Sequence, residues 1–442
     1  SGNRAKELRY VLPAGEQAVG QGAYREATQY LRRGLEIVDG LDESPERAAT
    51  ELALRLGMGG VMLTTHGQGS PEAKSYFDRV LELIAEAPPG QELVRALFGL
   101  WTFYLFRGDM LLTDDLARQI LAAAEGLADP EALLQAHFAV SATVYWLGDF
   151  PGTVHHADEV TRLYDPAQAA SYVARYAQNP RVTAAADAAW AEWIMGRADS
   201  ARRRAAETVA HARELGHDFV LTIALQIPAF LNLHMGDVPG TAIAAQEWLA
   251  CAERVGNPVY TGLATACLGW ATAAGGDAEP GLAMLGAVRQ GFLDQGVEVV
   301  DPLLATALAD AHLRCGQAVA GLELLDRAMA TARTKQQIAY LAEQHRLRAE
   351  LRLLAGAEPE EVEEDFRQAL SIADEQGARS YVLRAAISLA RALRDRPGAA
   401  EAEERLRSVR ASVTEGSDTP DLRLADAILV AGRSPTLEAP IS

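Results

Sequence analysis

The sequence predicts an all-α fold, a solenoid of about ten helical hairpins that repeat with a period of 40 residues. Three observations predict it: glycines recur at a fixed interval, small residues recur at two fixed positions around them, and alanine is abundant throughout the 442 residues. Alanine has the highest intrinsic helix propensity and lets neighbouring helices approach closely. No stretch shows a convincing strand-like alternation of apolar and polar residues.

A series of glycines marks the turn inside each predicted hairpin. The intervals between them are 40, 48, 40, 40, 40 and 40 residues, at Gly108, Gly148, Gly196, Gly236, Gly276, Gly316 and Gly356. A second series follows the second helix of each hairpin, at Gly216, Gly256, Gly296 and Gly377, with Gln336 in the place of one glycine. A glycine just past a helix adopts the left-handed conformation without steric cost, so both series predict helix ends.

Small residues flank each turn at fixed distances. Seven residues before the turn glycine stand Ala189, Ala229, Gly269, Ala309 and Ala349. Five residues after it stand Ala201, Thr241, Gly281 and Gly321, whereas Glu361 breaks the pattern. Two small residues twelve positions apart, on the two helices of a hairpin, permit close helix packing. Gly269 and Ala309 are therefore expected at helix crossings with no room for a larger side chain.

The hairpins follow one another along the chain without a domain boundary. They are expected over residues 4–40, 45–87, 90–127, 130–164, 181–216, 217–256, 257–296, 299–336, 337–377 and 378–414. Residues 1–414 thus form the solenoid, and 415–442 form a capping helix near 420–431 with a tail. The 48-residue interval indicates an insertion at about 165–180, bounded by X-Pro steps that disfavour helix. A surface insertion and a loop that lines a groove both remain open for it.

The repeating unit resembles the tetratricopeptide repeat (TPR). It shares the twelve-residue spacing of small residues, and the first unit carries the turn Gly22-Ala23-Tyr24-Arg25-Glu26-Ala27. The resemblance implies a right-handed superhelix. The period of 40 residues is longer than the usual 34 of a TPR, which longer helices would explain. HEAT and armadillo repeats also run near 40 residues and remain the alternative.

Composition and charge exclude several classes of function. The formal charge is −19, from 41 basic and 60 acidic residues, and an acidic chain repels phosphate backbones, so no nucleic-acid partner is expected. Cys251, Cys267 and Cys315 lack CxxC spacing and fit a reducing cytoplasm. The best apolar stretch, 219–233, is too short and too interrupted to span a membrane, and no secretory signal opens the chain. The opening Ser1-Gly2 is typical of a cleaved tag, so we expect an excised part of a longer protein.

No motif for catalysis or for metal binding stands out. The patterns GxxxxGK[ST], GxSxG and HExxH are absent, and the nearest phosphate-loop candidate, 69–75, lacks the second glycine. His155 and His156 would point about 100° apart on a helix, which suits a surface pair better than one metal ion. The acidic run 360–365 is expected at a helix start, where carboxylates favour the helix dipole. We expect no enzyme activity of this segment, no cofactor and no metal.

One position of the repeat carries the candidate binding residues. Six residues before each turn glycine stand Trp190, Phe230, Trp270, Asp310 and Glu350, and Gln226 and Arg346 share this face four residues earlier. In the TPR register this position faces the concave surface. Because a core position rarely accepts unpaired carboxylates, we expect part-exposed side chains. They would line a groove that is aromatic in the middle repeats and charged toward the C-terminal end. The alternative, that the rings fill space between first helices, stays open.

Three stretches resemble a family of large bacterial signalling proteins. They are 164–166 with 179–182 (Tyr-Asp-Pro, Asn-Pro-Arg-Val), 376–380 with 383–390 (Gln-Gly-Ala-Arg-Ser, Leu-Arg-Ala-Ala-Ile-Ser-Leu-Ala), and 414–422 (Thr-Glu-Gly-Ser-Asp-Thr-Pro-Asp-Leu). The chain is similar to the C-terminal TPR region of proteins that join an AAA-type ATPase to a class III adenylate/guanylate cyclase or a kinase. Ser417 departs from the family, which more often has an aromatic residue there. The chain resembles, more distantly, the sensor region of the maltose-regulon activator.

The resemblance implies a non-catalytic, cytoplasmic module that regulates an ATPase-cyclase or kinase module preceding it. Its partner would be a protein, a peptide or the upstream domains of the same polypeptide. The family's catalytic and ATP-binding residues would lie upstream, so none is assigned to this chain. The alternative is a small-molecule sensor that holds its ligand in the groove of the superhelix.

Overall fold

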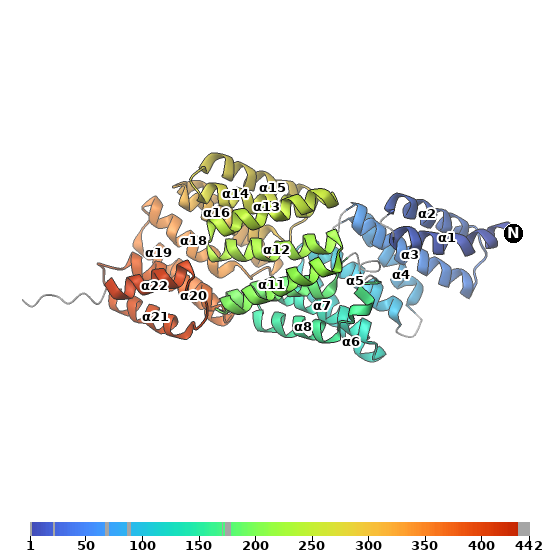
Figure 1. Cartoon of the computed structure of the whole chain (residues 1–442), viewed down its shortest axis with the longest axis horizontal. Coiled ribbons are helices and arrows are strands. Elements are labelled where there is room, and N and C mark those ends of the chain that lie inside the picture. The colour runs from blue at the N-terminus through green and yellow to red at the C-terminus, as the bar shows by residue number, and fades with distance from the viewer. Residues whose placement is uncertain are drawn as a thin grey trace, which may run out of the picture. The chain divides into compact units, whose positions relative to one another are not determined.

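The computed structural model describes residues 2–20, 23–66, 70–85, 90–169, 171–172 and 178–431. Within these ranges it has 21 α-helices with defined bounds and one short 3-10 helix, and no strand (Figure 1). The all-α prediction is confirmed. Parts of the predicted sequence features lie outside the described residues, namely Ser1, Gly22, Gly69 and the tail 432–442.

The helices form the predicted hairpins in order. The first four pairs are α1 (Gly2–Gly20) with α2 (Tyr24–Asp39), α3 (Pro45–His66) with α4 (Pro71–Ile84), α5 (Gln91–Phe106) with α6 (Met110–Leu127), and α7 (Pro130–Trp146) with α8 (Phe150–Leu163). The 3-10 helix η1 (Pro166–Gln168) follows, inside the predicted insertion, of which 170 and 173–177 lie outside the described residues.

Six further pairs and a last helix complete the chain. The pairs are α10 (Pro180–Ile194) with α11 (Ala198–Leu215), α12 (Asp218–Met235) with α13 (Val238–Val255), α14 (Pro258–Ala274) with α15 (Ala278–Asp294), α16 (Asp301–Arg314) with α17 (Ala318–Lys335), α18 (Leu341–Ala355) with α19 (Pro359–Glu375), and α20 (Arg379–Ala392) with α21 (Ala399–Ser412). The last helix is α22 (Pro420–Ala431), at the place the sequence predicts.

The glycine periodicity has the predicted cause. Every glycine of the two series has a positive φ, between 64° and 116°. Gln336, which replaces one of them, also has a positive φ of 59°. The helix end therefore imposes the left-handed conformation even where the residue is not glycine.

The small residues allow two helix backbones to touch. A Cβ atom built on Gly269 in α14 would lie 3.0 Å from the carbonyl oxygen of Gly281 in α15. A Cβ atom built on Gly281 would lie 2.3 Å from the amide nitrogen of Ala273. Ala309 is completely buried. The prediction that Gly269 and Ala309 sit where no larger side chain fits is confirmed for Gly269 by distance and is consistent with the burial of Ala309.

The chain divides into two compact units. The first comprises Ser1–Val144, His155–Ala184 and Phe292–Val300, and the second comprises Tyr145–Val154, Ala185–Gly291 and Asp301–Ser442. In the first unit, the Trp101 ring packs against Phe98 and Phe138, with centroids 5.0 and 5.6 Å away. Its indole N–H donates to the hydroxyl of Thr143 at 2.9 Å. These rings of α5 and α7 are buried and belong to the core of the first unit.

In the second unit, the first helices of successive hairpins pack side by side in a row. α12 packs on α14, α14 on α16, α16 on α18, α18 on α20, and α20 on α22 (Figure 1). Segments far apart in sequence also touch within this unit. The hydroxyls of Tyr145 and Tyr340 lie 2.7 Å apart, and the Ser380 hydroxyl donates to the carbonyl of Trp193 at 2.6 Å. The expectation that the apolar stretch 219–233 is too short to span a membrane is wrong by length and composition, since α12 is the one described helix that meets both criteria. However, 72% of this helix is buried in the protein.

Candidate functional site

The first helices of successive hairpins in the second unit line a half-open cavity of about 460 Å³, which we call the central pocket. Its lining comes from α12, α14, α16, α18, α20 and α22, with Tyr340 just before α18. The polar lining residues are His234, Thr306, Asp310, Arg314, Tyr340, Glu343, Arg346, Glu350, Tyr381, Arg384, Ser388, Arg391 and Asp421. The others are Leu233, Met235, Gly236, Trp270, Leu303, Ala307, Leu313, Leu347, Ile387, Pro420 and Leu424.

Four of the seven predicted binding residues meet in this pocket. Trp270, Asp310, Arg346 and Glu350 line it, and they come from α14, α16 and α18. The other three, Trp190, Phe230 and Gln226, are not among its lining residues. The charged end of the predicted column therefore coincides with a cavity, and a binding role for these residues stays a prediction.

The expectation of an exposed aromatic groove is wrong. Trp190, Phe230 and Trp270 are only 7%, 2% and 1% exposed, and Gln226 is buried too. Each ring fills the space between neighbouring helices, which is the alternative that the sequence left open. The centroid of Trp190 lies 5.5 Å from that of Phe230, and the Phe230 centroid lies 5.5 Å from that of Trp248.

Asp310 occupies the same column because its charge is paired. Its Oδ2 atom accepts hydrogen bonds from the indole N–H of Trp270 at 2.9 Å and from Nε of Arg314 at 2.7 Å. The Arg314 guanidinium also lies over the Trp270 ring, 5.5 Å from its centroid. A half-buried carboxylate is stable in such a setting because two donors replace the water it loses. Arg314 follows Asp310 by four residues, a signal that the sequence contains.

A network of ion pairs crosses the pocket from α18 to α22. Arg346 donates to both oxygens of Glu343, at 2.9 and 2.8 Å. Arg384 in α20 donates to Glu343 at 3.2 Å and, through Nε, to Asp421 in α22 at 2.7 Å. The Arg384 guanidinium also lies over the ring of Trp193, 5.0 Å from its centroid. Glu343, Arg384 and Asp421 are residues that sequence reasoning missed.

His234 makes one wall of the pocket polar but uncharged. Its ring stacks on that of Trp193, with centroids 5.2 Å apart and planes 9° apart. Its Nε2 atom lies 3.3 Å from the hydroxyl of Tyr340. Burial, and then the charge of Arg384, lower the pKa of His234 to about 3. The imidazole is therefore neutral at pH 7.

Several polar groups of the pocket keep unused hydrogen-bonding capacity. Glu350 accepts the hydroxyl of Ser388 at 2.6 Å through Oε1, and Arg346 approaches the same oxygen at 3.7 Å. Arg391 is exposed and has no polar partner among the described residues. The Tyr381 hydroxyl, on a side chain that is 2% exposed, has no hydrogen-bond partner in the described part of the chain. Such a buried group is uncommon and calls for an explanation.

The stretch 414–422 explains how α22 reaches the pocket. Glu415 accepts hydrogen bonds from the backbone N–H and the hydroxyl of Ser200, at 2.7 and 2.9 Å, and so caps the N-terminus of α11. Gly416 has a φ of 72° and donates its N–H to Asp199 at 3.0 Å. Asp418 pairs with Arg202 at 2.8 Å. The stretch 414–422 therefore has a structural role, which is to anchor α22.

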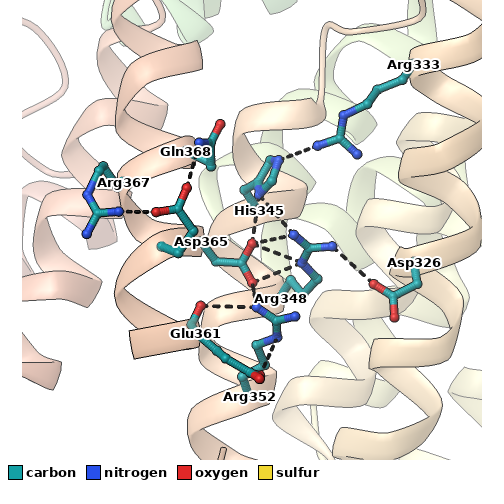
Figure 2. Close-up of polar contacts among 10 residues, drawn as sticks. Asp326, Arg333, His345, Arg348, Arg352, Glu361, Asp365, Arg367 and Gln368 are labelled. Atoms are coloured by element: carbon teal, nitrogen blue, oxygen red, sulfur yellow. Dashed lines mark hydrogen bonds and ion pairs between the residues drawn. The ribbon is translucent and has the colours of Figure 1, made fainter. Parts of the chain in front are cut away.

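A second polar cluster lies outside the pocket, on α18 and α19 (Figure 2). Asp365 is 1% exposed and accepts hydrogen bonds from His345 at 2.9 Å, from Nε of Arg348 at 3.0 Å and from Arg352 at 2.8 Å. Burial alone would raise the pKa of Asp365, but these donors hold it below its usual range. The run 360–365 lies at the start of α19, as expected, with Glu360 and Glu361 in the first turn. The Asp365 carboxylate has a further structural role, because it is buried and joins α18 to α19.

The described residues contain no group of three or more potential metal ligands. His156, one of the two adjacent histidines, pairs instead with His137, with their Nδ1 atoms 2.8 Å apart. The phosphate-loop candidate 69–75 begins with Gly69, which lies outside the described residues, and continues into the ordinary start of α4, where Ser70 is the N-cap.

Comparisons with known proteins place the fold. No family model matches the chain. It is 24% identical over 386 residues to an uncharacterised protein of Rhizobium meliloti (strain 1021), and the match covers 86% of this chain and 37% of that protein. The chain therefore spans little more than a third of the length of this curated relative.

Two solved structures are similar to the chain. One is a Rap protein complexed with Competence and Sporulation Factor, at 13% identity and a TM-score of 0.60, with 84% of this chain and 98% of that chain covered. The other is the Rap conjugation gene regulator of plasmid pLS20 in complex with the Phr* peptide, at 10% identity and a TM-score of 0.49, with 88% and 98% covered. The first likeness confirms that the fold is a TPR-like helical solenoid.

Proposed function

We propose that the chain is a non-catalytic, ligand-binding regulatory module and that the central pocket is its ligand site. One observation carries the proposal: a cavity of about 460 Å³ in which charged and apolar side chains from five successive hairpins converge. Ligand pockets of proteins have volumes of about 300–1,000 Å³ and combine an apolar lining with a few convergent polar groups. The Rap protein complexed with Competence and Sporulation Factor supports the idea that a fold of this kind holds a regulatory ligand.

The pocket favours a small ligand over a protein partner laid along the groove. An apolar segment of a partner would need exposed aromatic anchors, and Trp190, Phe230 and Trp270 are buried. The alternative drawn from the sequence, a small-molecule sensor, is therefore the form of the proposal that the geometry supports best. The net charge of −19 also disfavours a nucleic-acid partner, because an acidic chain repels phosphate backbones.

The regulated module would be another part of a longer protein. The resemblance to bacterial signalling proteins suggests an ATPase-cyclase or a kinase in the cytoplasm. A ligand that touches α14, α16, α18, α20 and α22 stabilises one relative arrangement of these helices over others. Such a ligand transmits regulation only through its difference in affinity for the two states of the attached module.

Thermal melting with a cell extract tests the proposal. The small-molecule fraction of a Rhizobium meliloti extract should raise the melting temperature of the chain, because a ligand that binds only the folded state stabilises it. Native mass spectrometry would give the mass of the bound molecule. The variant Ala307→Phe places a ring in the pocket, because Ala307 lines it and is buried.

The matched control is Ala330→Phe, since Ala330 is an exposed residue of α17 outside the pocket. We expect the extract to raise the melting temperature of the wild type and of Ala330→Phe, and to leave that of Ala307→Phe unchanged. An equal rise in the two variants would place the ligand elsewhere, and no rise in the wild type would contradict a ligand-binding function.

A further inference from the structure

We propose that the ligand of the central pocket is a zwitterion of the amino-acid type, with a free ammonium group, a free carboxylate and an aliphatic body between them. This inference rests on the proposed function, since it names the class of molecule that the same pocket takes. Free amino acids and short peptides share this chemistry, and the experiment below separates them.

The pocket lining carries equal numbers of opposite charges. Its four carboxylates face four guanidiniums; they are Asp310, Glu343, Glu350 and Asp421, with Arg314, Arg346, Arg384 and Arg391. His234 adds no charge at pH 7 because its pKa is low. A ligand of one sign would give the occupied pocket a net charge, and a buried charge is costly unless it is paired. A molecule that carries both signs matches this lining.

The internal ion pairs decide which charges can receive the ligand. Glu343 uses both oxygens on Arg346, so it is occupied within the protein. Asp310 uses only Oδ2, and the two partners of Glu350, Ser388 and Arg346, both meet Oε1. One oxygen of each therefore remains without a partner among the described residues. These two acceptors stand at the same repeat position on α16 and α18, and both suit an ammonium group.

The available cation lies one hairpin further along. Arg391 is in α20, lines the pocket and has no polar partner among the described residues. Its planar fork of N–H donors suits a carboxylate, which it can bind through two parallel hydrogen bonds. The ammonium end of the ligand would thus lie toward α16 and α18, and the carboxylate end toward α20.

An apolar stripe joins the two ends. Ala307, Leu347 and Ile387 occupy equivalent positions 40 residues apart on α16, α18 and α20, and all three line the pocket. Such a stripe contacts aliphatic side chains. The orphan hydroxyl of Tyr381 adds one donor, because burial keeps the phenol protonated by raising its pKa well above the usual value. A carbonyl of a peptide bond would satisfy this donor, which favours a short peptide over a free amino acid.

The experiment uses four defined probes: an equimolar pool of tripeptides made from alanine, valine and leucine, the same pool N-acetylated, the same pool C-amidated, and the three free amino acids. Binding to the wild-type chain is measured by calorimetry and by thermal melting. The free-ended pool should bind, and each capped pool should bind at least roughly tenfold more weakly, because each cap removes one charge-assisted contact. Binding by the free amino acids but not by the tripeptides would assign the first source, and the reverse would assign the second.

Two variants locate the two ends of the ligand. Glu350→Gln should abolish the preference for the free over the acetylated pool, and Arg391→Gln should abolish the preference for the free over the amidated pool. The matched controls are Glu323→Gln on α17 and Arg394→Gln just after α20, both exposed and outside the pocket. The two control variants should keep both preferences. Measuring each capped pool on each variant then assigns the loss of a preference to one side chain and one end of the ligand.

The outcomes separate this inference from the proposed function. Equal binding of free and capped pools, or no binding of the free-ended pool, would overturn the zwitterion. If the extract still raised the melting temperature of the wild type but not that of Ala307→Phe, the function would stand with another class of ligand. If the extract too had no effect, both would be wrong.

Discussion

The close approach of α14 and α15 gives the sharpest test of the fold. A Cβ atom at Gly281 would lie 2.3 Å from the amide nitrogen of Ala273 and 2.6 Å from the carbonyl oxygen of Gly269. Both are backbone atoms, so no side chain can turn away and the two helices must separate. On the same helix, a Cβ atom at Gly286 would meet nothing within 4 Å. The substitutions Gly281→Ala and Gly286→Ala are therefore chemically identical and differ only in the space that receives the methyl group.

The expected magnitudes follow from two effects. Alanine gains about 0.5–1 kcal/mol over glycine inside a helix, so Gly286→Ala should stabilise the protein by about that amount. Overpacking costs about 1–3 kcal/mol, so the Gly281→Ala variant should be less stable than the Gly286→Ala variant by about 1–3 kcal/mol. Urea denaturation followed by circular dichroism compares the two variants with the wild type. Equal stabilisation by both would mean that α14 and α15 are not in backbone contact and that the assigned register is wrong.

Three further predictions concern other parts of the second unit. Gly416→Ala should weaken the docking of α22 and speed hydrogen exchange in that helix. Residue 416 has a φ of 72°, and a Cβ atom there would lie 2.6 Å from the Cβ atom of Ala198. Unchanged hydrogen exchange in α22 would contradict this prediction. Asp365→Asn should destabilise the folded protein by about 3–5 kcal/mol, since it breaks a buried ion-pair cluster. The control Glu364→Gln, on the exposed face of α19, should change the stability by less than about 1 kcal/mol. Similar melting temperatures of the two variants would refute the role of burial. Burial raises the pKa of Asp187 in α10 to about 7, from a usual 3.8. Between about pH 4 and 7 the folded state keeps this proton while the unfolded chain loses it, so stability falls as the pH rises. Asp187→Asn should therefore raise the melting temperature at pH 8 and change it little at pH 4, and an equal rise at both pH values would be inconsistent with the raised pKa.

The helices could be predicted because the residues that end them act locally. Glycine is favoured where a helix ends in the left-handed backbone conformation, because it has no Cβ atom to clash there. A series of such helix ends gives the period of the repeat directly. The small residues at Gly269 and Gly281 likewise report a contact between consecutive helices. Gln336 shows the limit of this reasoning, since the same backbone conformation occurs there without the glycine that would announce it.

The pocket was predicted only in part because burial depends on partners distant in sequence. Asp310 is part-exposed, as expected, but the argument that its charge implies exposed rings elsewhere in the column overlooked its pairing with Arg314 one helical turn later and with Trp270 one repeat earlier. Nothing in a 40-residue register pairs Arg384 with Asp421, because α22 lies outside the repeat. The position of α22 in turn depends on contacts such as that of Glu415 with Ser200, between residues 215 positions apart.

Hydrogen exchange with and without the bound ligand tests the central claim most directly. The ligand is the molecule that native mass spectrometry finds on the chain after incubation with the extract. If the central pocket is its site, exchange should slow in α16, α18, α20 and α22 and remain unchanged in α1–α6. Slowed exchange confined to helices without pocket residues, while the ligand remains bound, would contradict the account.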